Sequence, residues 1–64
     1  MIKIYHTDTQ AIICDEQLKV FWSATKKDAV ELSRSIKSSI SRRETLAYAV
    51  ELLLTNGYKE VNLH

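Results

Sequence analysis

The chain has 64 residues, of which 9 are basic and 8 are acidic, and its formal net charge at neutral pH is +1. A chain of this length forms one small domain, near the lower size limit for a hydrophobic core that is stable without disulfides or a bound metal. The single cysteine excludes an intrachain disulfide, and the scarcity of cysteine and histidine argues against a structural metal site. Because the charge is nearly balanced, an electrostatic function would need local clusters of charge.

The sequence also disfavours membrane proteins and cofactor-binding proteins. No apolar run approaches the roughly 20 residues that span a bilayer, and the N-terminus has no signal-peptide pattern. The absence of proline and the single glycine argue against a linker or a glycine-rich phosphate loop. We therefore expect a cytoplasmic protein without cofactor, metal or small-molecule substrate. Since so short a chain buries little apolar surface alone, we also expect a homodimer.

Three strands are predicted in the first third of the chain. Residues 2–5 and 11–14 have the pattern of short strands, and polar turns at 6–10 and 15–17 follow them. Residues 18–23 form the third strand and are rich in β-forming side chains. The two-residue period of a strand places one set of side chains toward the core and the other on the opposite face: Leu18, Val20 and Trp22 inward, and Lys19, Phe21 and Ser23 outward. An exposed Phe21 indicates a contact surface, although it could equally pack on the N-terminal hairpin of its own chain.

Two helices are predicted after the strands. Thr25 is a good N-cap for the first, with Asp28 at the third helical position, and the serine-rich stretch around 37–41 favours a break. Its buried stripe is predicted at Ala29, Leu32, Ile36 and Ile40. Ser41 and Glu44 have the spacing of a capping box for the second helix. The apolar face of that helix is predicted at Leu46, Ala47, Val50, Leu53 and Leu54.

The second helix is predicted to end at Asn56, with Gly57 in the left-handed conformation. Residues 58–64 alternate weakly at Val61 and Leu63, a pattern that fits either a short edge strand or a tail. The order strand, strand, strand, helix, helix predicts an α+β domain in two layers. Within the single domain 1–64 we distinguish a hairpin-like extension (1–17), a strand-helix-helix unit (18–57) and the C-terminal segment.

The run Ile40-Ser-Arg-Arg-Glu-Thr-Leu-Ala-Tyr-Ala-Val-Glu-Leu-Leu-Leu54 follows a strand, a capped helix and a serine-rich turn. Together, residues 18–57 resemble the ribbon-helix-helix family of DNA-binding repressors and antitoxins. The resemblance implies that two chains pair their strands into an antiparallel ribbon, which enters the major groove of duplex DNA. It also implies that the second helix begins against the phosphate backbone. The expected function is then a small dimeric transcriptional regulator. A three-stranded meander covered by two helices is the alternative arrangement.

Carried over to this sequence, the resemblance assigns DNA contacts to the outward face of the ribbon and to the start of the second helix: Lys19, Phe21, Ser23, Ser41, Arg42 and Arg43. A helix start attracts phosphate through its free amides and its dipole. Phe21 departs from the family pattern, since its ring cannot form a hydrogen bond with a base edge. Contacts with a second chain or another partner are expected at Phe21, Trp22, Tyr48 and Leu52.

The alternative function is protein binding without DNA contact, as in a small phage or mobile-element protein that inhibits or adapts a host protein. An exposed aromatic side chain and a free sheet edge suit that function. Arg42 and Arg43 would then be part of a solvated helix start. An enzyme is not expected, because the sequence has no catalytic motif and little room for a pocket. If residues 18–23 pair within their own chain, we expect protein binding to be the better interpretation.

Overall fold

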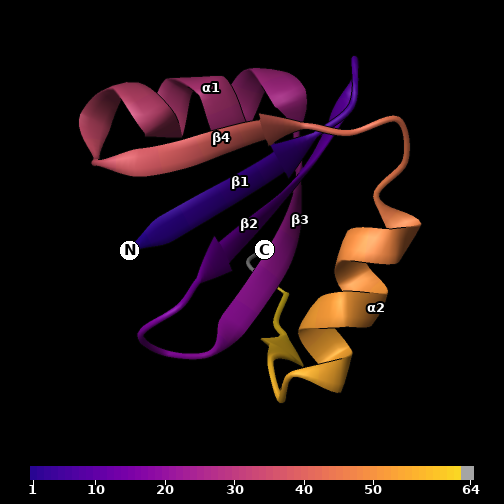
Figure 1. Ribbon diagram of the computed structural model, residues 1–64. Coiled ribbons are helices and arrows are strands. Elements are labelled where there is room, and N and C mark those ends of the chain that lie inside the picture. Colours follow the sequence, from indigo (N-terminus) through magenta and orange to yellow (C-terminus); the bar gives the residue numbers. More distant parts are fainter. Residues whose placement is uncertain (63–64) are drawn as a thin grey trace.

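Five strands and two helices form the described part of the chain, residues 1–62, in the computed structural model (Figure 1). In chain order they are β1 (Ile2–His6), β2 (Gln10–Asp15), β3 (Val20–Thr25), α1 (Lys26–Ser35), β4 (Ser38–Arg42), α2 (Ala47–Thr55) and β5 (Lys59–Glu60). The predicted α+β class is confirmed, and the three N-terminal strands lie close to their predicted positions. The strand β4, between the two helices, is not predicted by the sequence pattern.

The strands form one mixed sheet in the order β4-β1-β2-β3-β5. β1, β2 and β3 are an antiparallel meander, in which Ile4 is opposite Ile13 and Ile13 is opposite Trp22. β4 lies parallel to β1, and β5 lies parallel to the first residues of β3, Val20 and Phe21. The strand that the resemblance placed in a two-chain ribbon therefore pairs within its own chain.

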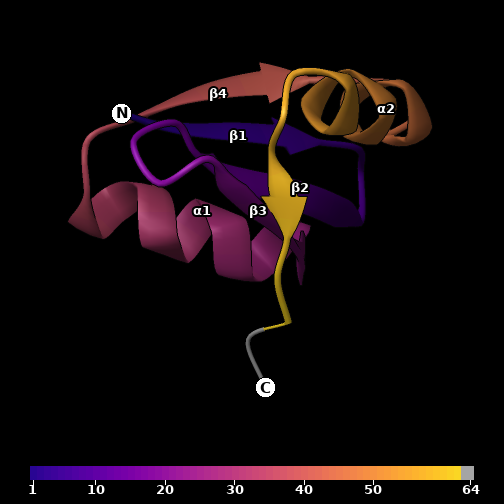
Figure 2. The ribbon, with the colours of Figure 1, turned by 90° about the horizontal axis from the view of Figure 1, so that it is seen from below.

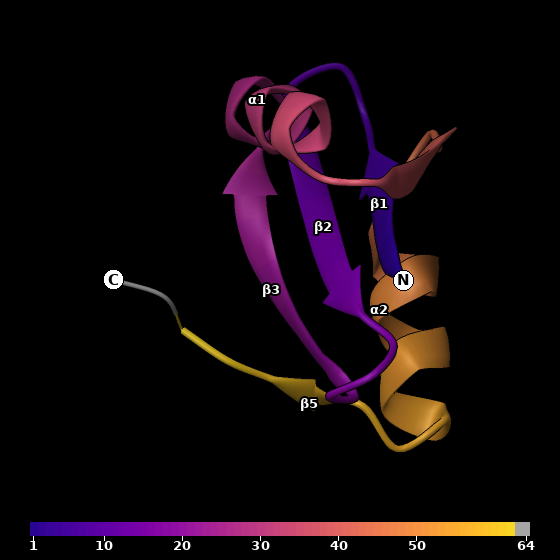
Figure 3. The same cartoon turned by 90° about the vertical axis from the view of Figure 1, so that its left-hand side faces the viewer.

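The two helices cover opposite faces of this sheet (Figures 2 and 3). On one face Ile4, Ala11 and Ile13 pack against Ala29 of α1. On the other face Ile12, Cys14 and Phe21 pack against Leu53 of α2. The prediction of two layers is wrong, because the meander is apolar on both faces and each face is covered by a helix.

Phe21 lies in the core under α2, so the prediction of an exposed aromatic side chain at this position is wrong. Its side chain is 0% exposed, and a fully buried ring cannot contact DNA or a second chain. Trp22, the next residue, packs against the α1 side instead. Leu18 is 72% exposed, contrary to its predicted inward position, because it lies in the turn before β3.

The helix α1 begins as the sequence predicts. The hydroxyl of Thr25 accepts a hydrogen bond from the Asp28 amide at 3.1 Å, which satisfies one of the free donors of the first turn. The helix ends at Ser35, within the region where serines were expected to weaken it. Ile36 is already extended, and Ile40, expected on the helical stripe, lies in β4.

The predicted start of the second helix is wrong. Ser41 and Arg42 lie in β4, beside Tyr5 and His6 of β1, and the amide of Arg43 donates to the His6 carbonyl at 2.7 Å. The helix α2 begins only at Ala47 and has no side-chain cap. The capping-box spacing thus falls on a segment whose backbone groups are satisfied by pairing with β1.

The end of α2 is predicted correctly. Gly57 has φ +85°, in the left-handed region that glycine tolerates best. Its amide donates to the Leu54 carbonyl at 3.2 Å, and the Tyr58 amide donates to the Leu53 carbonyl at 3.0 Å. This pair of bonds is a Schellman motif, which turns the chain back toward the sheet.

After this turn Lys59 and Glu60 form β5, so a short C-terminal strand is present. The amide of Lys59 donates to the Lys19 carbonyl at 2.9 Å, and that of Val61 donates to the Phe21 carbonyl at 2.9 Å. Residues 63 and 64, which include the predicted strand position Leu63, lie outside the described residues. Within residues 1–62 no helix has the length and apolar character needed to cross a membrane.

Candidate functional site

The residues predicted to contact DNA do not form one surface. Ser23 lies on β3, whereas Ser41 and Arg42 lie on β4, with β1 and β2 between these two strands. The guanidinium of Arg42 donates to the carboxylate of Asp8 at 2.6 Å. Lys19 and Arg43 both line one groove, although they are far apart in the sequence.

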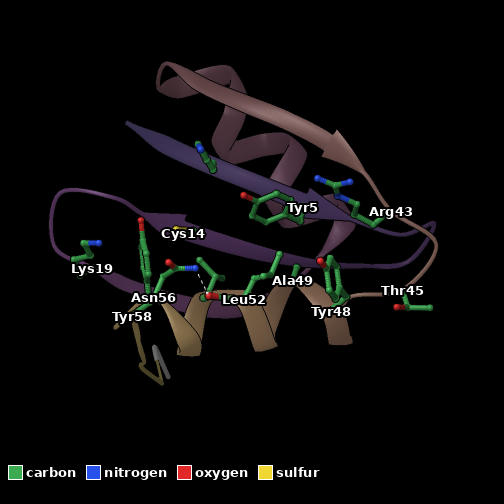
Figure 4. Close-up of a pocket in the computed structure, with 12 residues that line it drawn as sticks. Tyr5, Cys14, Lys19, Arg43, Thr45, Tyr48, Ala49, Leu52, Asn56 and Tyr58 are labelled. Atoms are coloured by element: carbon green, nitrogen blue, oxygen red, sulfur yellow. Dashed lines mark hydrogen bonds between the residues drawn. The ribbon is translucent and has the colours of Figure 1, made fainter.

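This groove lies between α2 and the facing side of the sheet, and we call it the α2 groove (Figure 4). Its volume is ≈ 340 Å³, within the range of natural ligand pockets, about 300–1,000 Å³. Its lining combines cations, tyrosines, small polar groups and the apolar side of α2: Lys3, Lys19, Arg43, Tyr5, Tyr48, Tyr58, Thr45, Asn56, Cys14, Ala49, Leu52 and Leu53.

Two of the three cations stack on tyrosine rings at different parts of the groove. The Lys19 ammonium lies 4.7 Å from the centroid of the Tyr58 ring, and the Arg43 guanidinium carbon lies 5.5 Å from that of Tyr5. Figure 4 shows Lys19 and Tyr58 at one end and Arg43 at the other. Cation–π contacts of this kind hold a side chain in place without neutralising its charge.

Lys3 is the third cation and lies on β1. Its ammonium is 3.4 Å from the Glu16 carboxylate, which raises the pKa of Lys3 and keeps it charged. Glu16 itself does not line the groove, and the lining formed by residues 1–62 contains no carboxylate and no histidine. The positive charge of the groove therefore comes mainly from Lys19 and Arg43, because Glu16 offsets part of the charge of Lys3.

The opposite wall is apolar and is formed by α2. Ala49 and Leu53 are each 8% exposed and close the groove from below, while Leu52 is 44% and Tyr48 is 69% exposed at its rim. The amide side chain of Asn56 donates to the Leu52 carbonyl at 2.7 Å and so fixes the last turn of the helix. A ligand in this groove would contact cations on one side and an apolar helix on the other.

Cys14 and Tyr58 are two groove residues whose pKa values are shifted by burial. Burial raises the pKa of the Cys14 thiol, so it stays protonated at neutral pH and is a poor nucleophile. Burial also raises the pKa of the Tyr58 hydroxyl, which keeps it a neutral hydrogen-bond donor. In the described chain no cluster of histidine, cysteine and carboxylate side chains is arranged to hold a metal ion. The lining offers a ligand cations, hydrogen-bond donors and apolar surface.

The predicted partner contacts divide between several environments. Tyr48 and Leu52 lie at the groove, Trp22 is half-buried on the α1 side, and Phe21 is buried. The sequence does not single out Lys3, Tyr5 or Tyr58, which come from β1 and from the turn after α2. They meet through strand register and helix packing, and no spacing along the chain indicates this.

The sequence matches no protein-family model, and comparisons with curated proteins and with solved structures found no match. The function is therefore inferred from the chemistry of the groove.

Proposed function

We propose that the chain is a small protein-binding module that inhibits or adapts another protein, and that the α2 groove takes an acidic segment of this partner. The observation that carries the proposal is the placement of Lys19 and Arg43, which form no ion pair within residues 1–62, opposite an apolar helix wall. Lys3 is a third cation at the groove, and its charge is partly offset by Glu16, which does not line the groove. Hydrogen bonds between ionised groups are stronger than neutral ones, particularly where water is partly excluded.

The rim of the groove favours a protein over a nucleic acid as the ligand. Tyr48 and Leu52 lie one helical turn apart and are both exposed. Tyrosine and arginine are enriched at the centres of protein interfaces, where an aromatic anchor and a charged group act together. An extended acidic segment with an apolar side chain would satisfy the cations and cover this exposed apolar surface at once.

DNA binding is the second candidate function. It is favoured by one observation: Lys19 and Arg43, two of the residues assigned to DNA by the resemblance, lie at one groove with Lys3. Against it, Phe21 is buried, Arg42 is bound to Asp8, and β3 pairs with β2 and β5 of its own chain.

The test is a selection of random peptides on the immobilised protein, followed by affinity measurements on the selected peptides. We expect peptides in which aspartate or glutamate lies beside an aliphatic or aromatic residue. The double variant Lys19→Gln/Arg43→Gln should weaken their binding by on the order of a hundredfold or more, since each of the two lost hydrogen bonds to a charged group contributes about 1.5–3 kcal/mol.

The matched control is Lys27→Gln/Arg34→Gln, which removes the same two kinds of charge from α1 on the other face of the sheet. It should bind the selected peptides as the unmodified protein does. Peptides without acidic enrichment, or equal loss in both double variants, would reject the proposal. Binding of non-specific duplex DNA that is lost steeply with salt and in the groove variant alone would support the second candidate instead.

A further inference from the structure

The two edges of the sheet differ in a way that bears on self-association. At one edge β5 has only two residues, Lys59 and Glu60, and both are charged. At the other edge β4 has five residues and one charge, Arg42, which is already paired with Asp8 at 2.6 Å. Natural edge strands are usually blunted by lysine, proline, a bulge or short length. β4 has none of these, and its outer side has no partner within residues 1–62.

One hydrogen bond at the end of β4, to β1, fixes the direction of the β4 backbone groups. The Arg43 amide donates inward, to the His6 carbonyl of β1. Because backbone groups alternate along a strand, the amides of Ser39 and Ser41 also point toward β1. The N–H and C=O groups of Ser38, Ile40 and Arg42 then point away from the sheet. These three residues present a row of free donors and acceptors.

We propose that β4 pairs antiparallel with β4 of a second copy of this chain, about a two-fold axis that passes beside Ile40. In this register Ile40 faces Ile40 of the second copy, and Ser38 faces Arg42. All three outward residues then meet outward residues, so they form the closely spaced hydrogen-bonded pairs of an antiparallel ladder. The two sheets would join into one, and each chain would supply the same surface, as a two-fold interface requires.

The apolar surface at this edge fits the same register. Ile40 is opposite Ile4 on β1, so the two side chains lie on the same face of the sheet, the one that α1 covers. Ile4 is 1% exposed, whereas Ile40 is 49% exposed and Ile36, at the end of α1, is 38% exposed. Exposed apolar side chains therefore lie at this edge, next to the core beneath α1. Pairing of two Ile40 side chains across the axis would cover this apolar surface.

Within β4 the charges are compatible with the proposed register, because Arg42 is opposite Ser38 and each Arg42 remains beside its own Asp8. Beyond the ladder, Lys37 of one copy is opposite Arg43 of the other at each end, and both side chains are exposed, so salt screens this like-charge pair. The ladder uses no residue that lines the α2 groove, and it therefore does not depend on the proposed function. It also places the dimer contact on β4, whereas the sequence pattern placed it at Phe21 and Trp22.

The test is the molar mass of the full chain by sedimentation equilibrium over a range of concentrations, together with amide exchange at the two ends of that range. We expect the mass to rise from one chain to two. At high concentration the amides of Ser38, Ile40 and Arg42 should gain protection, while those of Ser39 and Ser41 should change little. The variant Ile40→Lys should stay at the mass of one chain, and the control Leu18→Lys, at an exposed turn, should dimerise normally.

The register is tested by a pair of variants that differ only in charge sign. Ser38→Glu would face Arg42 of the second copy and should tighten the dimer, whereas Ser38→Arg should weaken it. The two dissociation constants should differ by on the order of tenfold, since the contact occurs twice in the dimer. A constant mass of one chain at all concentrations would overturn the proposal. It would also be overturned by equal effects of the two Ser38 variants, or by new protection at Trp22 to Thr25 in place of β4.

Discussion

Replacement of Phe21 by alanine distinguishes most sharply between the observed core position and a surface position. Phe21 is 0% exposed and is among the largest fully buried side chains, between β2, β3 and α2. Truncation of a buried phenylalanine to alanine costs about 3–5 kcal/mol of the free energy of unfolding. A domain of this length has a total of roughly 3–10 kcal/mol. Phe21→Ala should therefore be close to unfolded, and it should be measured by urea denaturation followed by circular dichroism.

Two further variants keep this experiment interpretable. Phe21→Leu removes less volume and should lower the free energy of unfolding by about 1–2 kcal/mol, leaving a fold that can be measured. Leu18→Ala, at a residue 72% exposed, should stay within about 0.5 kcal/mol of the parent, as most surface changes do. A loss below about 1 kcal/mol in Phe21→Ala would refute the burial of this ring and the packing of α2 over the sheet.

Asp8, Cys14 and Thr25 each have a local environment that a single measurement can test. A hydrogen bond from Arg42 and the charge of its guanidinium lower the pKa of Asp8 in the folded protein below the ordinary value of 3.8. The pair therefore stabilises the fold when the pH is above the pKa of Asp8 in the unfolded chain. This stabilisation is lost as the pH falls through the pKa of Asp8 in the folded protein. An NMR titration should place the Asp8 midpoint below 3.8, and Arg42→Gln should move it upward; an unmoved midpoint would contradict the pair. Cys14, 1% exposed and with its pKa raised by burial, should react with thiol reagents far more slowly in the native protein than in urea. Comparable rates in both would show that the Cys14 thiol is accessible to the reagent in the native protein. Thr25→Ala should cost about 1 kcal/mol on urea denaturation, with Thr25→Ser close to the parent, because the serine hydroxyl can still accept from the Asp28 amide. Equal losses in both variants would exclude the cap.

The local elements that depend on short-range chemistry are predictable from this sequence. The Thr25 cap and the Gly57 turn depend on residues within one helical turn, and both form as predicted. The β4 strand does not depend on such chemistry. Its sequence, Ser-Ser-Ile-Ser-Arg, is weakly apolar and continues into a capping-box spacing, so it resembles a helix start. Its partner β1 lies 36 positions earlier in the register Ile4 to Ile40, and local pattern carries no information about that pairing.

The candidate site was partly predictable for the same physical reason. Alternation along the third strand correctly separates Phe21 from Trp22 onto two faces, but it cannot show that both faces are covered. Tyr48 and Leu52 are identifiable from helical spacing as a stripe beside the main core. Lys3 and Lys19 reach the groove only because β1, the turn before β3 and α2 come together in the folded chain. Such convergence is a property of the tertiary structure and leaves no motif.

One chain builds the whole sheet, with β3 inside it. An isotope-filtered NOE experiment on an equal mixture of labelled and unlabelled protein tests this arrangement. We predict that contacts between Ile13 and Trp22 and between Val20 and Lys59 appear only within one chain. Contacts between the β3 strands of two chains would contradict this fold and restore the two-chain ribbon, and with it the DNA-binding interpretation.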